Sequence, residues 1–237
     1  MNNTTKLTMP LAAITGLALA ATSAHAAVVF TGAGSATEDS GTELAFAGDV
    51  SSSDLLHGLA VTAVGFNGGG DNDALNDGVL GDSFSVASQI NGAWTADGAT
   101  ATYDLGLGTN GLGWDITSIQ SIAAWVNVGF GDQAWTVAVS TDDVSYDNVA
   151  TVFYDPTSDG GSTKVTLTDL DISGIQYIKF TANLITGNGN GDVFIWREID
   201  VEGTATAVPE PSSAALLGLG VVTLLVTTPL FALTNKT

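Results

Sequence analysis

The chain has 237 residues, of which 25 are acidic and five are basic, so its net charge is −20. Such an acidic surface repels nucleic acid and anionic lipid, because binding to either needs clustered lysine and arginine. Cysteine is absent, so neither disulfides nor thiol chemistry is available. The chain has only two histidines, which removes the usual parts of most hydrolytic and metal-centred mechanisms. We therefore expect a protein that is not an enzyme.

The N-terminus has the features of a secretory signal peptide. Lys6 precedes an apolar stretch over residues 11–21, and the small-residue site Ala24-His25-Ala26 follows. Signal peptidase would cut after Ala26 and release residues 1–26. A buried N-terminal helix is the alternative interpretation of this segment. The pattern predicts export.

Residues 27–207 have a length suited to one domain. They contain 24 of the 25 acidic residues against three basic ones, a net charge of −21. High charge also occurs in disordered chains, but the apolar and aromatic content here is that of a chain with a core. Such a surface favours solubility outside the cell and recruitment of divalent cations.

The pattern along this domain is that of short β-strands. Residues 27–66 contain apolar stretches between polar turns, and a Gly/Asn/Asp-rich loop follows over 67–73. Further on, β-type runs alternate with Gly, Asp and Asn turns, without a helical period. The predicted strands are 83–87, 99–105, 119–128, 134–140, 148–154, 163–167, 176–182 and 193–201. Eight closely spaced strands predict an all-β fold, an antiparallel β-sandwich or jelly roll.

Tryptophan positions and one break in alternation refine this prediction. Trp125 and Trp135 fall within predicted strands and are expected in the core. In the last strand, Phe194 and Trp196 are out of phase by one residue with the pair Ile199 and Val201. Both pairs can face inward only if the strand has an extra residue near Arg197-Glu198, which is a β-bulge. Alternatively, Phe194 and Trp196 cover the outer surface.

A short proline motif and an uncharged span close the chain. The motif is Val208-Pro209-Glu210-Pro211-Ser212-Ser213, and the span covers residues 214–233. Twenty mostly apolar residues can cross about 30 Å of hydrocarbon as a transmembrane helix. Together these features resemble the PEP-CTERM sorting signal of bacterial envelope proteins. That family usually ends in an arginine cluster, whereas residues 234–237 here are Thr-Asn-Lys-Thr, so retention of the tail stays open.

The resemblance implies a route for the protein. The span 214–233 would insert transiently into the inner membrane, and an exosortase would recognise and remove the tail. The passenger would then reach the cell surface or the extracellular matrix. Signal peptidase and exosortase are therefore the expected partners during export.

A second resemblance covers residues 74–203. The order of short motifs there is similar to that of the galactose-binding-like jelly roll, the superfamily of discoidin (coagulation-factor type C) domains and many carbohydrate-binding modules. The motifs are Asp77-Gly78 before Asp82-Ser83-Phe84, then 101–106 (ATYDLG), 115–119 (DITSI), 135–146 (WTVAVSTDDVSY), 175–180 (IQYIKF) and 196–203 (WREIDVEG). The resemblance implies a jelly-roll fold. It leaves 27–73 to supply first strands or an extra hairpin.

The same resemblance implies a structural Ca²⁺. Many members hold this ion between the Asp-Gly turn and a glutamate on the final strand. By position these are Asp77 and Glu198, with Asp82 and the carbonyls of Ala74 and Arg197 as further ligands. Calcium takes six to eight oxygens, carbonyls included, and an irregular loop beside a bulged strand supplies them. The alternative is a solvated acidic turn closed by its own Asp side chains.

The resemblance also implies a ligand site at one end of the sandwich. Sugar-binding members stack an aromatic ring on the sugar beside polar groups. Candidates in the Gly-rich loops here are Trp94, Phe130, Asp132, Gln133, Asn188 and Asn190. Aromatic side chains in such loops also serve as lids over a sandwich end.

Two functions follow from these observations. The first is a non-catalytic surface or matrix protein that binds glycan or exopolysaccharide. The second is a purely structural, acidic component of the surface coat with no specific ligand. Carboxylate pairs such as Asp142-Asp143 nominally suit acid–base catalysis, but they lie in turn-like sequence, where solvated acids are usual.

Overall fold

The computed structural model describes residues 26–32, 46–66, 72–80, 93–95, 97–125, 130–155, 161–185 and 194–209. Within these ranges the chain forms antiparallel β-strands and two 3-10 helices, η1 (Ala47–Asp49) and η2 (Asn72–Leu75). No helix in these ranges is both long and apolar enough to span a membrane. The predicted signal peptide and the span 214–233 lie outside the described residues, apart from Ala26.

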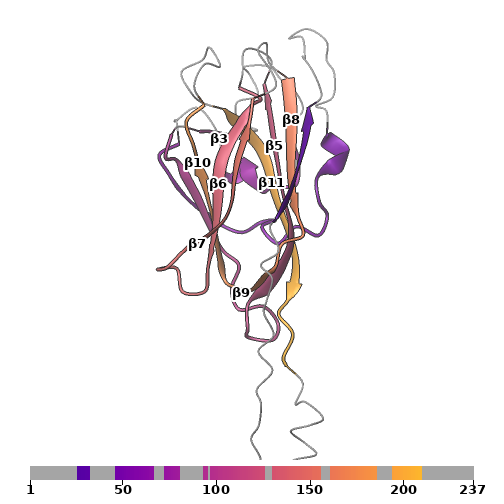
Figure 1. The fold of residues 1–237 in the computed structure, drawn as a ribbon, viewed down its shortest axis with the longest axis vertical. Coiled ribbons are helices and arrows are strands. Elements are labelled where there is room, and N and C mark those ends of the chain that lie inside the picture. The colour runs from indigo at the N-terminus through magenta and orange to yellow at the C-terminus, as the bar shows by residue number, and fades with distance from the viewer. Residues whose placement is uncertain are drawn as a thin grey trace, which may run out of the picture.

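The strands form two antiparallel sheets (Figure 1). The first sheet has the order β1 (Ala27–Gly32), β8 (Gly161–Thr168), β5 (Trp114–Trp125), β11 (Ile195–Ala205) and β3 (Ala93–Trp94), and β9 (Ile172–Ile175) also pairs with β5. The second sheet has the order β2 (Val61–Val64), β4 (Thr100–Asp104), β10 (Tyr177–Ala182), β6 (Gln133–Ser140) and β7 (Asp147–Tyr154). The predicted all-β, antiparallel architecture is confirmed.

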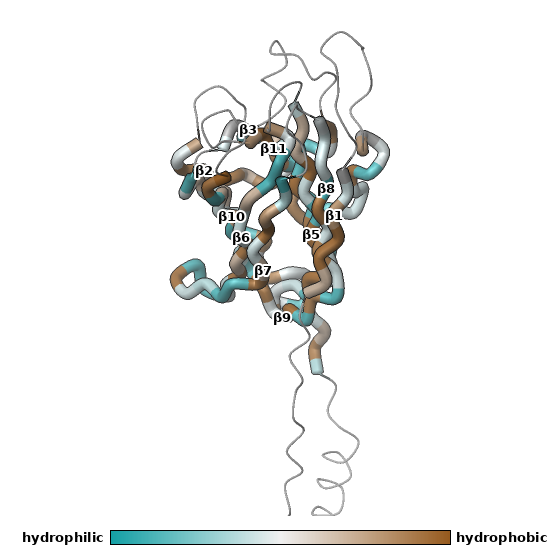
Figure 2. Tube along the Cα trace, turned by 45° about the horizontal axis from the view of Figure 1, so that its top comes forward, coloured by the Kyte–Doolittle hydropathy of each residue, from teal (hydrophilic) through white to brown (hydrophobic). Residues whose placement is uncertain are grey.

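The two sheets share one hydrophobic core. Alternate residues of β6 and β10 face it, so Trp135 and Phe180 are fully buried. The Phe180 ring packs edge-to-face on Trp135, with centroids 5.9 Å apart, and on Trp196 of the first sheet, with centroids 6.5 Å apart. Hydrophobic stretches run along β5 and β1 (Figure 2). This burial supplies most of the driving force for folding.

Trp125 is buried as predicted, but it lies in a smaller cluster apart from this core. Its neighbours there include Ile122, Phe130 and Ile195, and Phe46 and Val50 pack against the cluster. The segment that contains η1 therefore packs against the first sheet and buries a second set of apolar side chains.

The predicted bulge in the last strand is confirmed. The register between β11 and β5 shifts between Trp196 and Glu198. Phe194, Trp196, Ile199 and Val201 are consequently all fully buried in the shared core. The extra residue leaves Glu198 and Asp200 on the opposite face of the strand from Ile199.

Seven of the eight predicted strands overlap observed ones, and the eighth, 83–87, lies outside the described residues. The region 27–73, which the motif resemblance left unassigned, supplies edge strands to both sheets. β1 is the outer strand of the first sheet and β2 the outer strand of the second. These strands are therefore part of the sandwich itself.

The connections define two ends of the sandwich. At one end, which we call the loop end, Trp125 lies opposite Gly161, and Gln133 lies opposite Tyr154. At the other end β1 begins and β11 finishes, so residues 26 and 206–209 leave the fold there (Figure 1). Both described chain termini thus lie away from the loop end.

Candidate functional site

A short segment takes the place of a strand along β11. β3 pairs with β11 only at Ile195 and Trp196. Further along, the Leu55 amide donates to the Val201 carbonyl at 2.8 Å. In return, the Val201 amide donates to Asp54 Oδ1 at 2.7 Å. The Asp54 carboxylate therefore acts as the acceptor that a neighbouring strand would normally provide.

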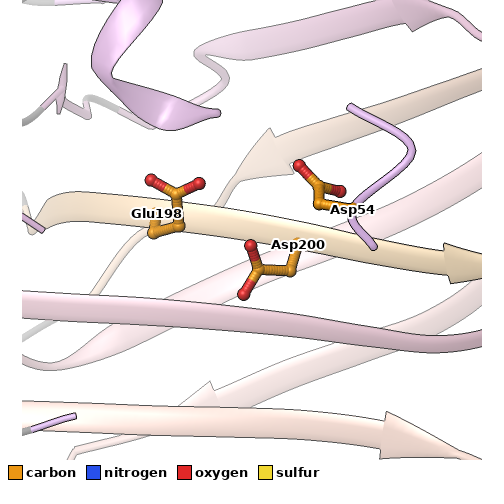
Figure 3. A group of neighbouring side chains, drawn as sticks. All are labelled: Asp54, Glu198 and Asp200. Carbon is orange, nitrogen blue, oxygen red and sulfur yellow. The ribbon is translucent and has the colours of Figure 1, made fainter. Parts of the chain in front are cut away.

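This arrangement brings three carboxylates together, and we call Asp54, Glu198 and Asp200 the acidic triad. One carboxylate oxygen from each lies within 4.8 Å of the others. Glu198 and Asp200 project from the same face of β11, and Asp54 reaches them from the neighbouring segment (Figure 3). Glu198 and Asp200 are 1% and 2% exposed. Three acids are thus gathered in an environment that excludes most water.

Each member of the triad has one oxygen held by the protein and one oxygen that accepts no hydrogen bond within the described part of the chain. Glu198 Oε1 accepts from the Gly78 amide at 3.2 Å. Asp200 Oδ2 accepts from Gln120 Nε2 at 2.8 Å. The remaining oxygens, Asp54 Oδ2, Glu198 Oε2 and Asp200 Oδ1, accept no hydrogen bond from any described residue. Buried carboxylate oxygens without partners are costly, so this arrangement favours a bound cation.

The electrostatics agree with this interpretation. Burial raises the pKa of Glu198 to about 9, and the nearby charge of Asp200 adds to the effect. Burial likewise raises the pKa of Asp54 to about 6. The pKa of Asp200 is also raised, first by burial and then by the charge of Glu202. Three carboxyl groups that resist ionisation together are stabilised as anions by a divalent ion.

Arg197, although it precedes Glu198 in the chain, points toward the small cluster around Trp125. Its Nε donates to the Ala124 carbonyl at 3.0 Å, and its guanidinium lies 5.3 Å from the Trp125 ring centroid.

The donor set of the triad is oxygen only, which suits Ca²⁺ or Mg²⁺ rather than a softer metal.

The expected metal ligands are only partly brought together. The Asp77-Gly78 turn does lie beside Glu198, as the Gly78 hydrogen bond records. However, Asp77 is exposed, and its Oδ1 accepts from the Val79 amide at 3.0 Å, which closes its own turn. Ala74 is buried, and Asp82 lies outside the described residues.

Sequence reasoning missed Asp54 and Asp200. Asp200 had a signal, because it stands two residues after Glu198 and therefore shares its strand face. Asp54 had none, because it lies in the region that the motif resemblance did not cover. His57 is exposed and lies beside the Asp77-Gly78 turn.

Two of the expected sugar-binding residues are buried in the protein. Gln133 is fully buried and links the two sheets. Its Nε2 donates to Thr163 Oγ1 at 2.9 Å, and its Oε1 accepts from Trp135 Nε1 at 2.9 Å. Asp132 is also fully buried. Neither side chain is open to a ligand in this conformation. The sequence prediction was wrong here because a polar residue just before or at the start of a strand gives no indication of whether its side chain faces in or out.

Phe130 is also mostly enclosed. It is 9% exposed, and its ring packs edge-to-face on Trp125 with centroids 6.4 Å apart. It therefore acts as a lid over the small cluster, the alternative recognised for aromatics in such loops. Asn188 and Asn190 lie outside the described residues, as does the side chain of Trp94.

The backbones of the predicted ligand loops nevertheless converge on one point. The Ile195 amide donates to the Phe130 carbonyl at 2.8 Å. Ile195 is also the register partner of Trp94. Residues 186–193, which contain both candidate asparagines, join Ile185 to Phe194 immediately before this point. The described backbones at Trp94 and Phe130, far apart in the sequence, therefore lie side by side at Ile195.

No family model matches the chain, and no curated protein matches it. Solved structures similar to it include carbohydrate-binding domains. A fucose-binding module of Streptococcus pneumoniae is 18% identical over 62% of this chain and 93% of that module, with a TM-score of 0.42. The family 32 carbohydrate-binding module from C. perfringens NanJ, in complex with galactose, is 18% identical over 60% and 92%, also with a TM-score of 0.42. A mutant lectin-binding domain of Lectinolysin, complexed with Lewis b, is 14% identical over 66% and 99%, with a TM-score of 0.46.

Proposed function

We propose that the protein is an exported, non-catalytic module of the cell surface or extracellular matrix that binds glycan at its loop end. The observation that carries the proposal is that the backbones at Trp94 and Phe130 both meet β11 at Ile195, which follows the segment 186–193 in the chain by two residues. Loops gathered on a rigid scaffold form the usual setting of a binding site. The motif resemblance over 74–203 supports a jelly-roll module with its ligand at that end.

The position of the chain termini fits such a role. Thr206, the last tightly held residue before the Pro209-Glu210-Pro211 motif, donates through Oγ1 to Asp115 at 2.6 Å. Its amide donates to the Gly113 carbonyl at 2.9 Å. A tail that inserts through 214–233 would hold this end near the membrane, and the loop end would then face outward. A module in this orientation meets extracellular polymer with its loops first.

A divalent cation, most simply Ca²⁺, completes the proposal. The acidic triad would bind it through Asp54 Oδ2, Glu198 Oε2 and Asp200 Oδ1. The ion would neutralise the triad and fasten the segment around Asp54 to β11. Its role would be structural, because the triad lies within the fold and away from the loop end.

Glycan binding is tested with the full-length chain in mild detergent on an array of neutral and acidic glycans. The informative variant is Trp94→Ala, since Phe130→Ala would open the buried cluster around Trp125. Leu107→Ala, an exposed site at the opposite end, is the control. The proposal predicts that Trp94→Ala lowers binding at least tenfold and that the control binds normally. Absence of binding to every glycan would leave the purely structural coat protein as the better account.

The sorting part is tested separately by mass spectrometry of the surface-exposed protein from its producing organism. The proposal predicts a mature N-terminus at Ala27 and a C-terminus near Pro209–Pro211. Recovery of an intact Thr237 outside the cell would contradict tail removal and would leave glycan binding unaffected.

A further inference from the structure

A polar groove crosses the outer face of the first sheet, away from the loop end. Its floor consists of alternate residues from three neighbouring strands, because Asp200 pairs with Gln120 and Gln120 pairs with Thr166. The segment at Ser51 forms one wall.

The volume of the groove is about 270 Å³. Drug-sized ligand pockets begin at roughly 300 Å³, so the groove suits a ligand about as large as a single sugar ring.

The groove presents hydroxyl, amide and carboxylate groups held in place by the protein. Glu202 Oε1 accepts from Ser51 Oγ at 2.7 Å, and Glu202 Oε2 accepts from Ser118 Oγ at 3.4 Å. Gln120 Nε2 donates to Asp200 Oδ2. A carboxylate fixed in this way keeps further lone pairs, which accept well from paired hydroxyls.

The charge balance of the groove selects among ligands. Asp49 is paired with Lys164, whose Nζ lies 2.6 Å from Asp49 Oδ2. The carboxyl groups of Glu202 and Asp200 offer acceptor oxygens and no positive charge, which disfavours carboxylated, sulfated or phosphorylated ligands. The hydrogen bonds that Glu202 accepts from Ser51 and Ser118 reduce its demand for a cationic partner. The chemistry that fits best is an uncharged molecule with several hydroxyl groups.

The groove is also connected to the acidic triad through one residue. Asp200 Oδ2 accepts from Gln120 in the groove, Oδ1 has no hydrogen-bond partner among the described residues, and the same carboxyl group belongs to the acidic triad. A cation on Oδ1 would fix the orientation of the whole carboxylate. The groove would then be best ordered when the triad is neutralised.

From this geometry we propose that the polar groove is a second saccharide site, specific for uncharged sugars and distinct from the loop end. It shares with the proposed function only the class of ligand. Thr166 and Thr168 of β8 supply further hydroxyls along the groove. Such a site would let one module contact a polysaccharide at two places, which raises the apparent affinity without tighter individual contacts.

The test uses the full-length chain with calcium, and cellohexaose, isomaltohexaose and tri-galacturonate as probes in titration calorimetry. The groove variant is Gln120→Leu with Thr166→Val, and Thr151→Val on β7 is the control. In a Trp94→Ala background we expect residual binding of a neutral probe, weakened at least tenfold by the groove variant. Tri-galacturonate should not bind the groove. Ser118→Ala offers a milder second variant if the double variant unfolds.

The outcomes separate the two sites. Loss of all binding in Trp94→Ala, unchanged binding in the groove variant, or binding of neither neutral probe would overturn the groove proposal. The first of these outcomes would leave the loop-end proposal standing. Conversely, binding that depends on Gln120 and Thr166 but not on Trp94 would support the groove and contradict the loop end.

Discussion

Replacing Asp54 by asparagine should have opposite effects with and without calcium. Two unit charges 4.8 Å apart repel by about 3.5 kcal/mol at an effective dielectric constant of 20. A pKa of about 6 for Asp54, against 3.8 in a model compound, corresponds to a penalty of up to about 3 kcal/mol at pH 8. Asparagine removes the charge, and its Oδ1 can keep the bonds to the Leu56 and Val201 amides.

In EDTA at pH 8, Asp54→Asn should therefore be more stable than the wild type by about 1–3 kcal/mol. With calcium at one hundred times its dissociation constant, the wild type should gain about 2.7 kcal/mol. For a domain of this size that corresponds to a rise in Tm of roughly 5–11 °C. The variant should gain little, because it lacks one of the three ligands.

Differential scanning calorimetry of the full-length chain in EDTA and in 10 mM calcium measures both effects. Asp104→Asn is the matched control, since Asp104 is exposed and also accepts from a turn amide, that of Gly106. The reasoning is refuted if calcium raises the Tm of Asp54→Asn as much as that of the wild type. It is also refuted if the variant is the less stable protein in EDTA.

Three further predictions concern stability. In EDTA, the free energy of unfolding should fall as pH rises from about 5 to 8, because the folded chain retains protons on Glu198 and Asp54 that the unfolded chain releases. A rise in this free energy over the same range, measured by urea titration, would contradict the prediction. Gln133→Leu should lower the free energy of unfolding, measured in urea, by about 2–4 kcal/mol, because it leaves the buried Trp135 indole and Ser121 hydroxyl without their acceptor. The exposed control Thr151→Val should change this free energy little. Gly131→Ala should lower the free energy of unfolding by about 1–3 kcal/mol, because a Cβ there would clash with the Gly161 carbonyl oxygen. The control Gly48→Ala places its Cβ in open space. Equal losses in the two variants would argue against this packing.

The fold was largely predictable because its signals are local. Alternation in β6 and β10 identified buried faces, and the phase break around Arg197 identified the bulge. β1 and β2 were not assigned as strands, because short edge strands next to loops carry few alternating residues. For the same reason, their positions at the edges of the two sheets could not be predicted.

The site was less predictable because it depends on contacts between distant segments. Glu198 and Asp200 meet Asp54 across more than 140 residues, through hydrogen bonds such as the pair at Val201. Gln133 looked like a loop residue by sequence, yet it is the buried link between the sheets. Loop positions could be predicted from the motifs, whereas the direction of each side chain could not.

Hydrogen–deuterium exchange of the full-length chain, with and without a glycan that it binds on the array, tests the central claim most directly. The account predicts slower exchange on binding in peptides that contain residues 93–95, 130–133 and 194–195, and no change over 105–113 at the opposite end. Protection confined to 105–113, or no protection at the loop end while glycan is bound, would contradict it.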